Sequence, residues 1–138
     1  MPTTLQDAVD FLQQGGKNGV EIVAGATDWF PARGERPLCQ PILDITKIAE
    51  LQGIERTLQG WRFGAAVTWS DILTADLPNC FAGLKAAARE VGSVQIQNVA
   101  TLAGNLCNAS PAADGVPPLL TLDAAVKLHR CRASGRCL

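Results

Sequence analysis

The chain has 138 residues, of which 47% are hydrophobic, and its 12 basic and 13 acidic residues give a formal net charge of −1. This length allows one core, or two small lobes that share an interface, and the hydrophobic content excludes a disordered chain. The near-neutral charge gives no reason to propose a nucleic-acid partner, and no apolar run approaches the length of a membrane span. The N-terminus lacks the basic and apolar regions of a signal peptide, so we expect a cytoplasmic protein.

Residues 1–50 are predicted to form a small N-terminal α/β lobe. Thr4 has the chemistry of a helix N-cap, apolar residues recur at helical spacing after it, and the pair Gly15-Gly16 ends the helix. Gly19–Val23 alternates apolar and polar residues and is predicted to be a strand, as is Pro41–Ile45. A helix with two such strands suggests a unit of the β-α-β type.

Residues 51–138 are predicted to form a second lobe around a mainly antiparallel sheet with flanking helices. The pattern predicts a hairpin around Gln59-Gly60, built from Gly53–Leu58 and Trp61–Val67. The remaining predicted elements are a short helix beginning at Thr68–Asp71, an amphipathic helix over Cys80–Val91, a helix starting at Pro117-Pro118 and a final strand over Ala124–Leu128. The expected fold class is therefore α+β.

The first candidate site is the turn Ala24-Gly25-Ala26-Thr27-Asp28, which follows the first predicted strand directly. Small residues at the end of a strand expose backbone N–H groups in a concavity, which binds phosphate oxygens without Lys or Arg. Gly25 is also compatible with a plain turn, since Gly is the usual turn residue. An acidic side chain close to a pyrophosphate is unfavourable, so we assign Asp28, with Thr27, to capping the following helical turn.

The second candidate site is the run from Asn98 to Asp114, which carries almost no charge before its last residue. It combines small residues, which let a ligand approach the backbone, with side-chain donors and acceptors. These polar residues are Thr101, Asn105, Asn108, Ser110 and the anionic acceptor Asp114. The composition is typical of the lining of a site for a large, hydrogen-bonding organic ligand.

Together the two runs resemble the FAD-binding medium subunit, or flavin domain, of the molybdenum hydroxylases, the family of xanthine dehydrogenase and carbon monoxide dehydrogenase. The first loop of that family has the form A-G-G-T-D, matched by Ala24–Asp28. The second has the form Q-I-R-N-x-x-T-x-G-G-N-x-x-N-A-S-P-A-A-D, matched by Gln95–Asp114. A G-x-x-x-T turn between them is matched by Gly64–Thr68, and the resemblance extends from about Leu5 to about Leu128.

The resemblance implies a fold of the PCMH type, with FAD in the crevice between the two lobes. It places Thr101, Gly104 and Asn105 on the flavin or its diphosphate, and Asp114 on ribose hydroxyls. It also implies that Thr68, Asn108 and Ser110 are cofactor-binding residues. Two structural alternatives stay open: Asn105 as a bridge between two loops, and Asp114 as the N-cap of the helix near Pro117. Trp29 is interpreted as a packing residue that adjoins the first loop and has access to the flavin.

The implied function is electron transfer within a multi-subunit oxidoreductase. Substrate is oxidised on a molybdopterin-binding large subunit, and electrons pass through the [2Fe-2S] clusters of a small subunit to FAD on this chain, then to an acceptor such as NAD or a quinone. The redox chemistry belongs to the cofactor, so no catalytic residue is assigned. The alternative is a truncated family fragment that binds FAD weakly or not at all and acts only as an interaction module.

The chain departs from the family pattern in composition and in length. Ala26 and Ala103 stand where the two loops usually have Gly, and an Ala with positive φ is strained by roughly 1 kcal/mol or more. Gln97 replaces a usual Arg. Family members continue beyond the point where this chain ends, at Leu138, and the tail from Ala133 resembles the start of their next segment. We therefore expect an incomplete second lobe and a tendency to self-associate.

No metal site is expected from the cysteines or the histidine. Five cysteines are scattered without a C-x-x-C pair, at positions 39, 80, 107, 131 and 137. Such a set predicts reduced, partly buried thiols rather than an iron–sulfur or zinc site. His129 is the only histidine, and beside Arg130 near the chain end it is expected to be solvated.

Overall fold

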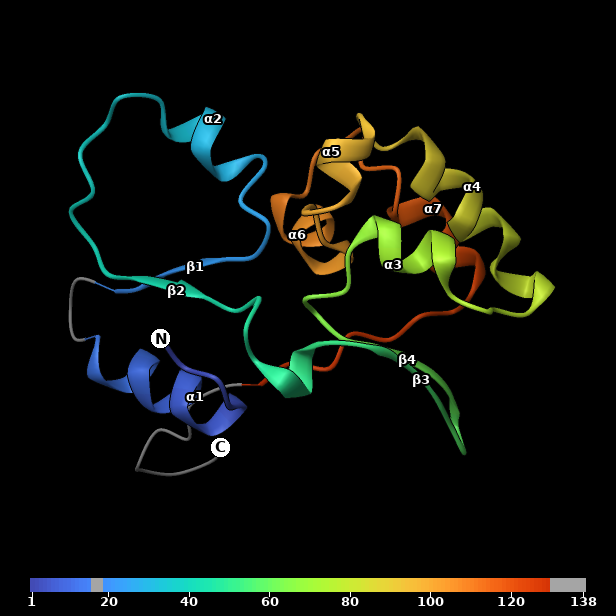
Figure 1. Ribbon diagram of the computed structural model, residues 1–138, viewed down its shortest axis with the longest axis horizontal. Helices are drawn as coiled ribbons and strands as arrows, with labels where there is room; N and C mark the ends of the chain where they lie inside the picture. The colour runs from blue at the N-terminus through green and yellow to red at the C-terminus, as the bar shows by residue number, and fades with distance from the viewer. Residues whose placement is uncertain (16–18, 130–138) are drawn as a thin grey trace.

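The computed structural model describes residues 1–15 and 19–129 and has two regions that differ in architecture (Figure 1). The fold class is α+β, with two separate two-stranded sheets in this part of the chain. The elements are α1 (Leu5–Gln14), β1 (Glu21–Val23), α2 (Trp29–Arg33), β2 (Ile42–Asp44), the 3-10 helix η2 (Ala49–Leu51), β3 (Ile54–Thr57), β4 (Gly60–Phe63), α3 (Trp69–Thr74), the 3-10 helix η3 (Asn79–Phe81), α4 (Ala82–Glu90), α5 (Val94–Gln97), α6 (Leu102–Asn108) and α7 (Val116–Thr121).

The N-terminal region forms the predicted helix and the two predicted strands. The Thr4 hydroxyl accepts the Asp7 N–H at 3.2 Å, which caps α1 as its sequence predicts. Strands β1 and β2 pair in parallel, with Glu21 opposite Ile42, and the short helix α2 lies between them in the chain. A small core forms where α1 packs against β2 and the segment after it, around Ala8, Leu43 and Ile48.

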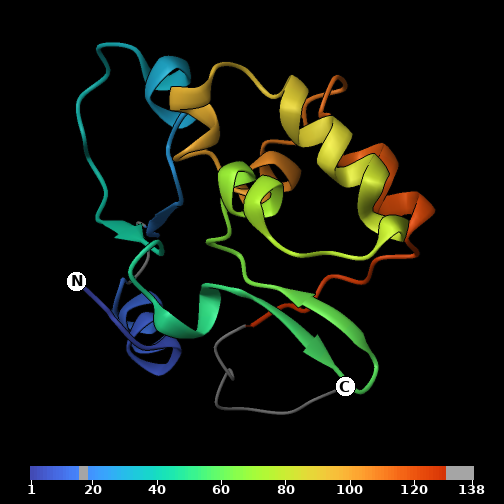
Figure 2. The ribbon, with the colours of Figure 1, turned by 45° about the vertical axis from the view of Figure 1, so that its right-hand side comes forward.

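The predicted hairpin also forms, but its turn lies one residue earlier than the expected Gln59-Gly60, and its second strand ends at Phe63 instead of Val67. Strands β3 and β4 pair antiparallel from Ile54 opposite Phe63 to Thr57 opposite Gly60, so the turn is Leu58-Gln59. Figure 2 shows the hairpin extending beneath α3 and α4. Its apolar face packs on the larger core, where the rings of Trp61 and Phe63 lie 5.9 and 5.5 Å from the ring of Phe81.

The larger core lies among the helices of the second region. Trp69, Ile72 and Leu84 are fully buried there, and the pattern that predicts the amphipathic helix is the one that places Leu84 and Ala88 inward. The helix α4 is shorter than the prediction of 80–91, because η3 precedes it. The buried Gln97 amide donates to the Val91 carbonyl at 3.1 Å, so it satisfies backbone at the end of α4.

The starts of two helices pair with each other in the second region. Thr68 and Thr101 are the N-caps of α3 and α6, and they face each other in an isolated antiparallel bridge. The Trp69 N–H donates to the Ala100 carbonyl at 3.2 Å, and the Leu102 N–H donates to the Val67 carbonyl at 3.0 Å. These bonds fix the segment at residues 99–101 against the start of α3.

Three sequence-based expectations are wrong or fall outside the described range. The segment Ala124–Leu128 is not a strand: no neighbouring strand within residues 1–15 and 19–129 pairs with it, and Val126 and Leu128 are 70% and 84% exposed. Cys39, Cys80 and Cys107 are free thiols, but they are exposed rather than partly buried, because they lie on a loop and on outer helix faces. Cys131, Cys137 and the tail from Ala133 lie outside the described residues.

The structure holds no helix, in the part of the chain that it describes, with the length and apolar character to cross a membrane.

Burial in the larger core predicts that substitutions of two leucines change the free energy of unfolding by different amounts. Leu84→Ala is expected to lower the free energy of unfolding by about 2–5 kcal/mol, because Leu84 is fully buried and its loss leaves a cavity. Leu58→Ala in the hairpin turn is the matched control, and a change within about 0.5 kcal/mol is expected there because Leu58 is fully exposed. Chemical denaturation measures both, and equal losses would contradict this core.

Candidate functional site

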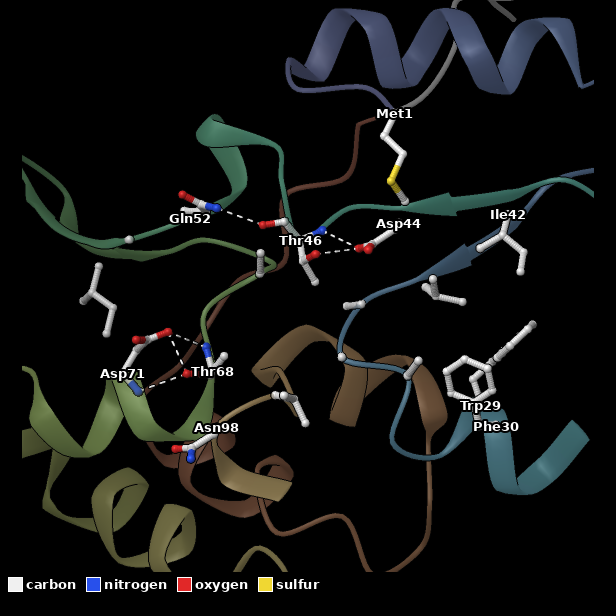
Figure 3. A pocket seen from close by; sticks show the side chains of 18 of the residues that line it. Met1, Trp29, Phe30, Ile42, Asp44, Thr46, Gln52, Thr68, Asp71 and Asn98 are labelled. Carbon is white, nitrogen blue, oxygen red and sulfur yellow. Dashed lines mark hydrogen bonds between the residues drawn. The ribbon is translucent and has the colours of Figure 1, made fainter. Parts of the chain in front are cut away.

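A cavity of about 1100 Å³ lies between the N-terminal region and the helical region (Figure 3). Its size reaches the upper end of small-molecule and cofactor sites, which is roughly 300–1,000 Å³. Most of its walls come from the loop after β1, the end of β2, the segment before β3, the start of α3 and the segment before α6. The lining residues are Met1, Val23, Ala24, Gly25, Ala26, Trp29, Phe30, Ile42, Asp44, Thr46, Gln52, Gly53, Ile54, Ala66, Thr68, Asp71, Thr74, Ala75, Asn98 and Val99.

The loop after β1 brings unpaired backbone donors to this cavity. Within the described residues, none of the N–H groups of Ala24, Gly25, Ala26 and Thr27 donates a hydrogen bond. Ala26 has φ 55°, in the left-handed region, where a residue turns successive N–H groups into a concavity. A loop of this kind has the geometry to hold oxygens of a phosphate or diphosphate.

Gly25 is required by space rather than by its φ angle. Its φ is not in the left-handed region, whereas that of Ala26 is. A Cβ on Gly25 would overlap the carbonyl oxygen of Val99 and lie 3.0 Å from the Ala100 Cα. The absence of a side chain therefore lets the loop after β1 pack directly on the backbone that precedes α6.

The polar wall of the cavity carries two carboxylates that are already engaged. Asp44 accepts the N–H and the hydroxyl of Thr46 at 2.9 and 2.7 Å. Asp71 accepts the N–H and the hydroxyl of Thr68 at 2.8 and 2.7 Å, as part of the capping box of α3. The described lining includes no Lys or Arg, so an anionic ligand here depends on backbone N–H groups.

The opposite wall is apolar and aromatic. Trp29 and Phe30 lie side by side near Ile42, away from Thr68 and Asp71 (Figure 3). Their ring centroids are 4.9 Å apart at an interplanar angle of 79°. A ligand with a flat ring and a polar chain matches this division of the cavity.

Four of the predicted site residues line the cavity, and one assignment in the first loop is wrong. Ala24, Gly25, Ala26 and Thr68 line the cavity, whereas Thr27 and Asp28 continue the same loop without lining it. The capping role assigned to the Asp28 side chain is wrong. Asp28 is at the N-cap of α2 but its carboxylate makes no capping bond, because its backbone is already helical with φ −98° and ψ −31°.

Asn98 and Val99, at the start of the second motif, line this cavity, whereas its predicted cofactor-binding residues lie on and around α6 and do not line it. These residues are Thr101, Gly104, Asn105, Asn108, Ser110 and Asp114. Thr101 is buried and accepts the Gly104 N–H at 3.0 Å, which caps α6. Asn105 accepts the Gly115 N–H at 3.3 Å, which is the bridging role left open from the sequence. Gly115, not Asp114, is the N-cap of α7, and Asp114 is exposed.

Asp44, Thr46, Asp71 and Asn98 line the cavity without having been singled out from the sequence. The spacings D-x-T and T-x-x-D predict local hydrogen bonds between side chain and backbone, which are common at turns and helix starts. They do not indicate which of these turns meet in space. Asn98 accepts the Ser70 hydroxyl at 2.6 Å, and only the tertiary fold brings those residues together.

Comparison with known proteins agrees with the sequence motifs. Residues 1–137 match the family model described as the FAD binding domain in molybdopterin dehydrogenase. The chain belongs to this family. It is 33% identical over 132 residues to the xanthine dehydrogenase FAD-binding subunit of Escherichia coli O157:H7, covering 94% of this chain and 44% of that protein. It is 36% identical over 137 residues to the nicotinate dehydrogenase FAD-subunit of Eubacterium barkeri, covering 96% and 46%.

Solved structures of the family share the fold. A chain of carbon monoxide dehydrogenase from Hydrogenophaga pseudoflava superposes with a TM-score of 0.70 at 26% identity, over 83% of this chain and 40% of that one. The predicted family and the α+β fold class are thus confirmed. The chain spans less than half the length of the curated relatives named here.

The Gly25 contact predicts that a methyl group is not tolerated there. Gly25→Ala is expected to lower the free energy of unfolding by about 1–3 kcal/mol, because the added Cβ forces apart two backbone segments. Gly83→Ala in α4 is the control, since its Cβ would meet only the Pro118 side chain at 3.9 Å. For Gly83→Ala the free energy of unfolding should stay unchanged or rise by up to about 1 kcal/mol. Equal behaviour of the two variants in denaturant titrations would contradict the packing role of Gly25.

The left-handed conformation of Ala26 predicts a stabilising substitution. Ala26→Gly removes strain of roughly 1–2 kcal/mol and adds about 0.5–1 kcal/mol of unfolded-state flexibility, so unfolding should cost up to about 1 kcal/mol more. Ala103→Gly is the matched control. It replaces the other alanine that stands at a family glycine, but within the helix α6, and should destabilise by about 0.5–1 kcal/mol. Thermal melts compare them, and a loss of stability in both would refute the strain at Ala26.

Proposed function

We propose that this chain binds FAD in the cavity between its two regions, with the diphosphate on the free N–H groups of the loop at Ala24–Thr27. The observation that carries this proposal is that loop: unpaired donors and a left-handed residue at the wall of a cofactor-sized cavity without cationic side chains. Family membership supports the same ligand. The contacts of Thr101, Gly104, Asn105, Asn108, Ser110 and Asp114 with FAD stay a prediction from the sequence motif.

The proposed role of the bound flavin is electron transfer. FAD supplies the redox chemistry by accepting and releasing electrons, while the residues of this chain bind it, orient it and surround it with an apolar wall and a polar wall. The partners would be a molybdopterin-binding large subunit and a [2Fe-2S] small subunit, and the final acceptor NAD or a quinone. Relatives named as FAD subunits of xanthine and nicotinate dehydrogenases support this assignment.

The binding site is tested by adding one negative charge to the cavity wall. Val99 is 46% exposed and lines the cavity together with Ala24, Gly25 and Ala26. Val99→Glu should weaken FAD at least tenfold, because a carboxylate beside the loop repels the diphosphate in a partly desolvated site. Titrations of FAD followed by its absorbance and fluorescence measure the affinity.

Val94→Glu is the matched control, since Val94 is also exposed, at 66%, but does not line the cavity. Its affinity for FAD should stay within about twofold of the original. Equal weakening in both variants would contradict the proposed location of the diphosphate. A chain that binds no FAD at all would instead favour the alternative of a family fragment that acts as an interaction module.

A further inference from the structure

Trp29 separates the large cavity from a smaller one. It lines both the cavity of about 1100 Å³ and a second cavity of about 250 Å³, whose other lining residues are Glu21, Arg33, Arg36, Pro37 and Cys39. Trp29 is only half-buried, so part of its side chain lies against cavity space rather than protein. Its orientation therefore depends on specific polar contacts.

Two charged residues supply those contacts. The indole N–H of Trp29 donates to Glu21 Oε2 at 2.7 Å. The guanidinium of Arg33 lies over the indole ring, 5.0 Å from its centroid, and Arg33 also pairs with Glu21 Oε2 at 3.5 Å. The Arg33 and Glu21 side chains are only 14% and 31% exposed, so solvent screens this cluster less than a surface ion pair.

The Trp29 ring thus held supports a second aromatic ring that is open to the large cavity. Phe30 contacts Trp29 edge-on, lines the same cavity and is 65% exposed. A large aromatic side chain exposed within a cavity gains free energy when a ligand covers it. Ile42 and Val99 are further apolar residues of the cavity lining.

We infer that Trp29 and Phe30 form a subsite for a flat heteroaromatic ring of the cofactor, and that Glu21 is a positioning residue acting through the Trp29 indole. The inference rests on the proposed binding of FAD in the large cavity. FAD carries two rings of this chemistry, adenine and isoalloxazine. An apolar aromatic corner is suited to either ring.

The test is a double-mutant cycle on FAD affinity. Glu21→Leu should weaken FAD about fivefold or more, because the indole loses its acceptor, and Trp29→Leu should weaken it at least as much. Since Glu21 acts through the indole, Glu21→Leu combined with Trp29→Leu should bind no more weakly than Trp29→Leu alone. Losses that simply add would overturn the positioning role, and unchanged affinity in folded single variants would overturn the subsite.

A conservative variant separates the indole bond from the ion pair. Glu21→Gln removes the charge that pairs with Arg33 but keeps an oxygen that accepts the indole N–H, so its FAD affinity should stay within about twofold. If Glu21→Gln weakens FAD binding as much as Glu21→Leu does, Glu21 does not act through its hydrogen bond with the Trp29 indole. Glu55→Leu is the matched control, since Glu55 pairs with Arg62 on the hairpin at the same 3.5 Å and does not line the large cavity.

Ligand fragments identify which ring occupies the subsite. If the ring is isoalloxazine, Trp29→Leu weakens FMN while ADP affinity is unchanged, and if it is adenine the pattern is reversed. Either pattern supports the subsite, and no change with both fragments overturns it. Circular-dichroism melts confirm that each variant is folded. If the unsubstituted chain binds no FAD, the proposed function is refuted. If it binds FAD but substitutions at Glu21 and Trp29 leave the affinity unchanged, only this inference is refuted.

Discussion

Gly25 brings the loop after β1 onto the backbone of Val99 and Ala100, at a distance that leaves no room for a Cβ. Those residues are in turn fixed by the two bonds that cross between the starts of α3 and α6. The loop is therefore anchored to the larger core, although it belongs to the region with the smaller one. This contact joins the two regions beside the cavity, while the four N–H groups from Ala24 to Thr27 stay unpaired.

The chemistry of the cavity follows from which of its polar groups remain available. The carboxylates of Asp44 and Asp71 are held by Thr46 and Thr68, so each adds negative charge to the wall but is oriented by neighbours in the chain. With no cation in the described lining, the loop N–H groups are the donors suited to an anion. The aromatic wall at Trp29 and Phe30 completes an environment suited to a ligand that is ionic in one part and flat and apolar in another.

The features that the sequence predicts correctly are those set by neighbours in the chain. Thr4 and Thr68 cap helices because their hydroxyls reach N–H groups three residues later, and the hairpin at residues 54–63 follows from alternation around a turn. Long motifs also identify the family, since they combine many positions.

The features that the sequence does not predict depend on distant contacts. Nothing local shows that Gly25 meets Val99, or that Asp44 and Asp71 line the same cavity. The apolar pattern of Ala124–Leu128 suggests a strand, but a strand requires a paired neighbour, which the described chain does not provide. Likewise the polar residues of the second motif suggest a ligand, whereas Thr101 and Asn105 satisfy backbone N–H groups at helix starts.

The diphosphate site on the loop after β1 is tested most directly by titrating the isotopically labelled chain with FAD and following the amide resonances by solution NMR. We expect the largest changes at the amides of Ala24, Gly25, Ala26 and Thr27, because their free N–H groups gain phosphate acceptors. Saturable changes confined to residues 101–114, with the amides of residues 24–27 unmoved, would contradict it.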